Sequence, residues 1–164
     1  MNNNNNNNNN EFLDLQTSKI ELQEFPHLKK DQIIKIVTWN VNGLRVNDNS
    51  LNILLEKGIL IHNKILENPD ILCLNETKID DGKLKEFGFD TKWKNKYFTY
   101  WNCCKIKPGY SGVAIFTKFK PISVYEGIGV KDCDQEGRVL TIEFESFYTQ
   151  FRNSKFNINN FCSF

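Results

Sequence analysis

The sequence of 164 residues is long enough for one domain of ordinary size and too short for two. Apolar residues make up 40% of it, with thirteen Phe, so the chain can build a hydrophobic core. The formal net charge of +1 excludes a strongly basic protein that would attract nucleic acid through its overall field. No apolar run approaches the ~20 residues of a membrane span and no signal peptide is evident, so we expect an intracellular, soluble protein without a membrane partner.

Charge is unevenly distributed along the chain. The segment from Lys78 to Lys120 holds ten Lys against four acidic residues, whereas the segment from Pro121 onward holds four basic and six acidic residues. A basic middle segment can meet phosphate groups, although a solvated lysine-rich face explains the same composition.

The cysteines and histidines exclude the common metal and disulfide frameworks. The five cysteines are an odd number, contain no C-x-x-C pair and form no zinc-site spacing with the two histidines. The adjacent Cys103 and Cys104 are therefore expected to be reduced thiols. His27 lies in a poorly patterned region and His62 near the apolar face of a predicted helix, so neither is expected to be a ligand.

The first 32 residues are expected to lie outside the folded domain. Residues 2–10 are nine consecutive Asn. Such a tract cannot bury enough apolar surface to offset the entropy lost on ordering, so a disordered, low-complexity extension is predicted over residues 1–32.

Two short apolar runs predict parallel strands. Residues 32–39 are β-branched and mostly apolar, which is typical of a central strand. Pro69 precedes the second run, and residues 71–74 predict a strand buried on both faces.

A helix is predicted between these strands, which would complete a βαβ unit. Asn49 and Ser50 can cap a helix from about Leu51 to Glu67, where apolar residues recur with the helical period. Gly58 lowers the stability of its middle by ~1 kcal/mol relative to Ala.

Polar side chains follow the two predicted strands. Asn40 and Asn42 come after the first strand, and the carboxylate of Glu76 comes just after the second. Ligand groups in open α/β sheets collect beyond the carboxyl ends of the strands, and parallel strands place those ends at one edge. Glu76 taken alone is equally compatible with a surface acid, but this convergence favours a catalytic or metal-binding role.

The rest of the chain predicts antiparallel strands, so the expected sheet is mixed. Lys and aromatic side chains alternate over residues 92–101, which suits either a nucleic-acid surface or a half-exposed strand. From Ser146 onward the sequence is rich in Asn and Phe without a clear period, so an irregular tail is expected over residues 148–164. The predicted elements are a short helix over residues 83–89 and strands over residues 97–101, 113–117, 122–125 and 139–144.

Four blocks of sequence, in order, resemble the exonuclease III family of apurinic/apyrimidinic (AP) endonucleases, within the endonuclease/exonuclease/phosphatase superfamily. They are KIVTWNVNGLR at 35–45, PDILCLNETK at 69–78, GYSGV at 109–113 and DQEGR at 134–138. The resemblance covers about residues 33–147 and implies the N-terminal half of the family domain. The implied fold class is α/β: half of a four-layer α/β sandwich, with a mixed sheet and flanking helices.

The resemblance also implies roles for single residues. Glu76 would be the principal carboxylate ligand of a catalytic Mg²⁺, with Mn²⁺ as an alternative, and Asn42 would lie close to the same ion. Asn40 would join the hydrogen-bond network near the scissile phosphate. Asn75 departs from the family, whose members carry Gln before the Glu. Contacts with DNA are implied for Arg45, Lys78, Tyr100 and Arg138.

The implied activity is cleavage of the phosphodiester 5′ to abasic sites in double-stranded DNA, a step of base-excision repair. In this family a water attacks the phosphodiester and the metal neutralises the developing charge. No obligate protein partner is implied. The substrate implies a location in the nucleus, with a mitochondrial pool as an alternative.

The family draws further catalytic groups, including an Asp-x-Asn and an Asp-His pair, from the second half of its domain. These motifs have no counterpart in the sequence. The chain as written is therefore expected to be truncated and inactive. Two alternatives stay open: a non-catalytic, pseudogene-like product with weak DNA or metal binding, and a phospholipid or inositol-phosphate phosphatase, against which the GYSGV and DQEGR blocks argue.

Overall fold

The computed structural model describes residues 23–24, 33–57, 59–60, 65–66, 68–145 and 148–152. The poly-Asn tract, both histidines, Cys162 and the tail after residue 152 lie outside the described residues. Within these ranges, no helix has the length and apolar character needed to cross a bilayer.

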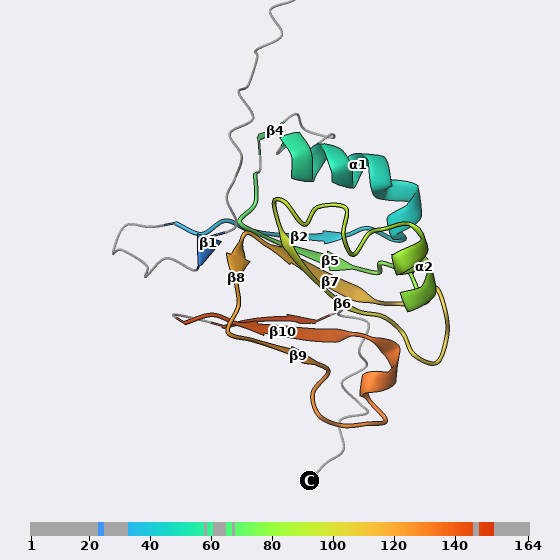
Figure 1. The fold of residues 1–164 in the computed structure, drawn as a ribbon. Coiled ribbons are helices and arrows are strands. Elements are labelled where there is room, and N and C mark those ends of the chain that lie inside the picture. Colours follow the sequence, from blue (N-terminus) through green and yellow to red (C-terminus); the bar gives the residue numbers. More distant parts are fainter. Residues whose placement is uncertain are drawn as a thin grey trace, which may run out of the picture.

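A four-stranded mixed sheet forms the centre of the fold, in the order β2-β5-β7-β6 (Figure 1). β2 and β5 run parallel, whereas β7 runs antiparallel to both of its neighbours. The predicted mixed sheet and parallel pair are confirmed. The strands are β2 (Ile36–Asn40), β5 (Ile71–Asn75), β6 (Phe98–Asn102) and β7 (Val113–Thr117).

Helix α1 (Leu44–Lys57) follows β2 almost at once, and the prediction of a helix start at Leu51 was wrong. The predicted caps Asn49 and Ser50 lie inside the helix. Gly43 has a φ of 110°, which lets the chain turn sharply at the end of β2. The helix therefore begins without a longer loop.

The end of α1 also differs from the prediction. The strands β3 (Ile59–Leu60) and β4 (Ile65–Leu66) form an antiparallel pair where the helix was expected to continue to Glu67. The helix ends immediately before Gly58, the residue type that disfavours helix most after Pro. Two adjacent apolar residues such as Ile59–Leu60 are compatible with a helix or with a strand, so hydrophobic periodicity could not distinguish the two structures here.

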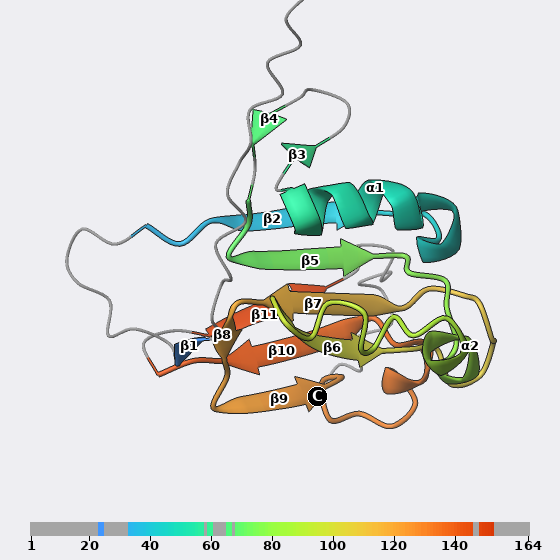
Figure 2. The ribbon, with the colours of Figure 1, turned by 45° about the horizontal axis from the view of Figure 1, so that its top comes forward.

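One face of the mixed sheet is covered by α1, by α2 (Asp81–Glu86) and by the segment that follows α2 (Figures 1 and 2). Phe116 of β7 is the centre of an aromatic group in this layer, with the rings of Trp93 and Trp101 each 5.4 Å away in edge-on packing. The Asp80 side chain caps α2 by accepting the N–H of Lys83 at 3.0 Å. The first hydrophobic cluster includes Leu44, Leu51, Leu54, Leu72, Leu74, Ile79, Leu84, Trp93, Tyr97 and Phe116.

The opposite face is covered by a three-stranded antiparallel sheet in the order β11-β10-β9 (Figure 1). Its strands are β9 (Ser123–Glu126), β10 (Val139–Glu143) and β11 (Tyr148–Arg152). The layers of helices, mixed sheet and second sheet confirm the α/β class with flanking helices. The second hydrophobic cluster, between the sheets, comprises Ile71, Cys73, Val113, Ile115, Phe119, Leu140, Ile142 and Phe144.

Two short strands lie within the segments that were expected to be irregular, most of which falls outside the described residues. Residues 148–152 form β11, paired along β10 from Val139 opposite Arg152 to Glu143 opposite Tyr148. The segment YTQFR contains three residue types that favour strands, and β10 offers it a free edge. Gln23–Glu24 form β1, which pairs with β8 (Phe119–Lys120) inside the extension that was expected to be disordered.

Two buried thiols have raised pKa values. The four described cysteines are free, which confirms the prediction for Cys103 and Cys104. Burial raises the pKa of Cys73 to about 12. Burial, together with the neighbouring Asp81, raises the pKa of Cys103 to about 12.

We expect the free energy of unfolding to fall as pH rises above about 9, because these thiols ionise in the unfolded chain and stay protonated in the folded one. The loss should be about 1 kcal/mol per thiol at roughly one pH unit above the ordinary thiol pKa. Urea denaturation between pH 8 and 10 measures it. Cys73→Ala should flatten the dependence, and Cys133→Ala, at a half-buried site, should not. An unchanged slope in Cys73→Ala would contradict the explanation.

Candidate functional site

A row of polar residues marks the edge of the mixed sheet where β2 and β5 end. Asn40 lies beside Asn75 in the parallel register, and Asn75 and Asn102 lie on either side of Val113. Because successive side chains of a strand point to opposite faces of the sheet, Asn40, Asn75 and Asn102 lie on the face toward β10. Glu76 directly follows Asn75, so the parallel pairing brings the predicted residues of both strands to one edge.

The backbone ladder continues beyond this edge into three loops. The loop after β2 is bonded to the loop after β5, and the loop after β5 is bonded to the loop before β7. The three loops are therefore held together by main-chain hydrogen bonds that do not depend on side-chain identity. In the first set, the N–H groups of Val41, Gly43 and Leu44 donate, in that order, to the carbonyls of Asn75, Glu76 and Thr77 at 3.0, 2.8 and 2.8 Å. In the second set, the N–H of Thr77 donates to the Gly112 carbonyl at 3.2 Å, and the N–H of Lys78 donates to the Ser111 carbonyl at 2.8 Å.

Unusual backbone conformations are concentrated in the same loops. Four of the five described non-glycine residues with positive φ lie here: Asn42 (44°), Glu76 (52°), Lys78 (48°) and Ser111 (48°). Each such residue costs of order 1–3 kcal/mol and persists only where the surrounding structure fixes it, which is common at functional sites. The strain supports a functional role for this edge.

A chain of polar contacts links the predicted site residues. The N–H of Asn42 donates to Oδ1 of Asn40 at 3.0 Å. The Lys78 ammonium donates to Oδ1 of Asn42 and lies 3.2 Å from Oε2 of Glu76. Glu76 is only 5% exposed. Lys78, predicted to contact DNA, thus contacts both of the predicted metal ligands.

The oxygen atoms of Glu76 and Asn42 suit a hard divalent cation. Carboxylate and amide oxygens are ligands that Mg²⁺ accepts, with water molecules completing its coordination. Both oxygens contact one nitrogen, Nζ of Lys78, so a single cation can reach both. Across the part of the chain that the structure describes, no three His, Cys, Asp or Glu gather into a metal cluster. An ion here would rest on one carboxylate and one amide.

Arg45 and Tyr100 lie in different surroundings. Arg45 is exposed in the first turn of α1, directly after the loop that carries Asn42. Tyr100 is half-buried in β6 and packs against the second hydrophobic cluster, and burial raises its pKa. Arg45 is therefore available to a phosphate, whereas a contact of Tyr100 with DNA stays a prediction.

Arg138 lies directly before β10 and is only 6% exposed. Its Nε donates to the carboxylate of Glu136, and its Nη2 donates to the Tyr110 hydroxyl at 3.0 Å. The guanidinium is 5.4 Å from the centre of the Tyr110 ring, and the Lys107 ammonium is 4.9 Å from it. Arg138 thus fixes Tyr110, and its own predicted DNA contact stays untested. Sequence reasoning missed Tyr110, although it lies in the GYSGV block.

Buried polar side chains complete the edge and were also missed. Asn102 donates from Nδ2 to the Val139 carbonyl at 2.8 Å and so connects the mixed sheet to β10. Among the described residues, the buried oxygens Asn75 Oδ1, Thr77 Oγ1, Asn102 Oδ1 and Ser111 Oγ have no hydrogen-bond partner. An unpaired buried polar group costs about 1–3 kcal/mol, so this polar interior is unusual for a purely structural edge.

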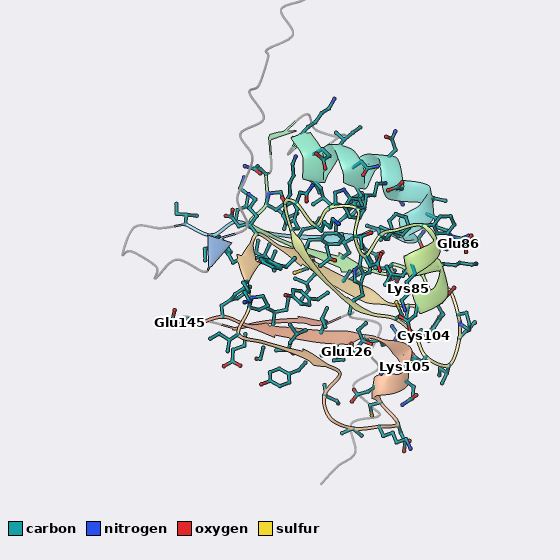
Figure 3. All side chains as sticks on the ribbon, viewed as in Figure 1. Lys85, Glu86, Cys104, Lys105, Glu126 and Glu145 are labelled. Atoms are coloured by element: carbon teal, nitrogen blue, oxygen red, sulfur yellow. The ribbon has the colours of Figure 1, made fainter. Side chains whose placement is uncertain are left out.

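The loop after β6 connects the two layers at the same end of the molecule. Figure 3 shows Cys104 and Lys105 between α2, which carries Lys85, and the end of β9 at Glu126. The Lys105 ammonium is 3.6 Å from the Glu126 carboxylate, and the Lys105 backbone N–H donates to the Gln135 carbonyl at 2.8 Å. The loops around the edge are thus supported from both layers.

Comparison with known proteins gives a consistent result. Residues 37–158 match the model of the Endonuclease/Exonuclease/phosphatase family, so the match extends beyond residue 147, where the sequence resemblance was expected to end. The chain is 44% identical over 115 residues to the exodeoxyribonuclease of Bacillus subtilis, covering 70% of this chain and 40% of that protein. It is 35% identical over 123 residues to the DNA-(apurinic or apyrimidinic site) endonuclease of Dictyostelium discoideum, covering 75% and 30%.

The fold is similar to that of solved nucleases. A structure of the 3′ phosphatase NExo from Neisseria, bound to a product DNA hairpin, matches with a TM-score of 0.54 and 28% identity, covering 72% of this chain and 40% of that one. The chain spans 40% or less of the length of each of these three proteins.

Replacing Gly137 with Ala should destabilise the protein more than replacing Gly129. A Cβ at Gly137 would lie 2.6 Å from the Asn102 carbonyl oxygen, whereas a Cβ at Gly129 would meet nothing within 4 Å. Both glycines have positive φ, so the difference isolates the close approach at Gly137. We expect losses of about 3 kcal/mol for Gly137→Ala and about 1 kcal/mol for Gly129→Ala in urea denaturation. Equal losses would contradict close packing of Gly137 on the end of β6.

Proposed function

The chain belongs to the endonuclease/exonuclease/phosphatase family, and on this premise we propose that it is a Mg²⁺-dependent nuclease that cleaves DNA 5′ to abasic sites. Its relatives are AP endonucleases and exonucleases of the exonuclease III type. The observation that carries the proposal is the continuous set of contacts from Asn40 through Asn42 and Lys78 to Glu76 at one edge of the sheet.

Glu76 and Asn42 would hold the metal ion in this proposal. Nucleases of this family are generally Mg²⁺-dependent. Bound there, the ion would neutralise negative charge on the phosphate and on the leaving oxygen. Glu76 suits this role because it is buried, because its carbonyl accepts the N–H of Gly43, and because the next residue, Thr77, is hydrogen-bonded to Gly112.

Asn40 would orient the phosphate. Its Oδ1 already accepts the N–H of Asn42, which fixes the amide plane. The amide NH₂ group is then the part of Asn40 that can donate to a phosphate oxygen. Preorganised donors of this kind stabilise charge that develops in the transition state.

Double-stranded DNA containing abasic sites is the substrate we propose. Arg45 is exposed beside the metal-binding edge, and Lys107 lies beside Tyr110 on the neighbouring loop. Cationic side chains around an acidic centre would bind the backbone on either side of the scissile phosphate. The DNA hairpin bound to the similar Neisseria protein supports a nucleic-acid substrate. A nuclear location follows from this substrate only.

Binding without cleavage is the second candidate function. In the described ranges, Glu76 is the one carboxylate of the Asn40–Glu76 contact chain, and it is already paired with Lys78. A site of this composition can hold a cation or a phosphate but provides no separate group to activate a water. The expected inactivity of the chain as written corresponds to this candidate.

Strand nicking of a duplex with a single abasic analogue tests the proposal. We expect Mg²⁺-dependent nicking that EDTA abolishes and that Glu76→Gln lowers by about 10²–10³-fold, because the variant removes the one negatively charged ligand. Glu86→Gln is the matched control, since Glu86 is an exposed residue of α2 (Figure 3) and should leave the rate unchanged.

Fluorescence anisotropy on the same duplex separates the two candidates. Binding without nicking, by folded protein of confirmed mass, would reject the endonuclease and support the binding function. Nicking that survives in Glu76→Gln would exclude this edge as the active site.

A further inference from the structure

We propose that Lys78 is a resident cation of the metal site, which competes with the divalent ion for Glu76 and Asn42 and thereby weakens metal binding. The inference rests on the proposed role of these two residues as metal ligands. It assigns to Lys78 a function in setting metal affinity, which differs from the DNA contact that the sequence resemblance implied.

The contacts of Lys78 are those of a bridging cation. Its ammonium donates to Oδ1 of Asn42 and lies 3.2 Å from Oε2 of Glu76. These oxygens come from loops after two different strands, β2 and β5. An ammonium group that holds both oxygens occupies the electrostatic position that a metal ion bound to them would take.

The acid in this pair differs from the acids in the other described ion pairs. The Glu76 side chain is 7% exposed, whereas the acidic partners in the other described pairs are 25–52% exposed. A buried carboxylate without a compensating charge is strongly unfavourable. Glu76 therefore needs a cation, and Lys78 provides one when no metal is bound.

The Lys78 backbone keeps the ammonium near the site. Its φ of 48° is left-handed, and its N–H donates to the Ser111 carbonyl at 2.8 Å. The Lys78 side chain is 37% exposed. The ammonium thus lies between the buried carboxylate and solvent, where a flexible side chain can swing outward without any change in the loop.

Charge explains the competition. Glu76 and Lys78 together are neutral, and Asn42 adds an oxygen without charge, so the site offers a divalent ion no net attraction while the ammonium remains. Binding of the ion requires displacement of the ammonium. By linkage, the metal weakens the hold on Lys78 as much as Lys78 weakens the hold on the metal.

Metal titration of charge-removing variants tests this inference. We expect Lys78→Met to lower the dissociation constant of Mn²⁺, followed by its free electron paramagnetic resonance signal, by about tenfold, which corresponds to about 1.4 kcal/mol. Mg²⁺ should displace the Mn²⁺. Lys85→Met is the matched control, because Lys85 is an exposed lysine of α2 at the same end of the molecule (Figure 3) and its loss should change the constant less than twofold. Lys78→Arg keeps the charge and should not tighten binding.

A measurement on the unmodified chain covers the case in which Lys78→Met does not fold. With ¹³C-labelled lysine, the Lys78 side-chain signal should move saturably on addition of Mg²⁺, with the dissociation constant of the metal, while the Lys85 signal stays in place. A Lys78 signal that does not move while Mg²⁺ binds overturns the competition.

The outcomes separate this inference from the proposed function. Mn²⁺ binding that is lost in Glu76→Gln but not tightened in Lys78→Met leaves the metal site intact and overturns the role of Lys78. No saturable binding to any folded variant overturns the metal site and the inference with it. Tighter binding in Lys78→Met supports both, whatever the nicking activity.

Discussion

Parallel pairing of β2 with β5, continued past the ends of both strands, is the constraint on which the candidate site depends. The ladder runs on from Val41 through Leu44 to the carbonyls of Asn75 to Thr77, and from there to the loop before β7. As a result, the residues before and after Glu76 in the chain, Asn75 and Thr77, both have hydrogen-bonded main-chain groups. The main chain of three loops therefore fixes the backbone from which its carboxylate extends, and a left-handed residue at this position is maintained by its neighbours.

This arrangement is costly, and the two hydrophobic clusters offset the cost. Strained residues and unpaired buried oxygens gather at the edge, while each face of the mixed sheet is packed against its own layer. Asn102 connects the two regions, because it ends β6 and also donates to the first residue of β10. Burial of apolar side chains on both faces supplies stability that the polar edge lacks, which is a common division between scaffold and site.

Sequence patterns predicted the strands of the mixed sheet well, and the turns and the shortest strands poorly. The run over residues 113–117 matched β7 in full, because five apolar or β-branched residues between turn residues have few alternatives. The helix start was misplaced, because the turn at Gly43 depends on a hydrogen bond from Leu44 to the Thr77 carbonyl, which no local pattern contains. Glu76 was singled out by strand order and by the family resemblance, and its role as a metal ligand stays a prediction. The contact of Tyr110 with Arg138 and that of Lys78 with Asn42 each join residues that are distant in sequence, so no local spacing could have indicated them.

Asn42 is the residue at which sequence and structure together change the interpretation of the site. Asn42 contributes an uncharged amide rather than a carboxylate. Within the described contact chain, Glu76 is therefore the one acid in contact with Lys78, and the pair is neutral. The same lysine would be outnumbered in a site with two carboxylates, and a metal ion would still be attracted. An amide ligand and a bridging lysine therefore act in the same direction, since both reduce the pull on a divalent ion. In the proposed metal site, the affinity for a divalent ion would then depend on how readily a half-exposed ammonium leaves a buried carboxylate.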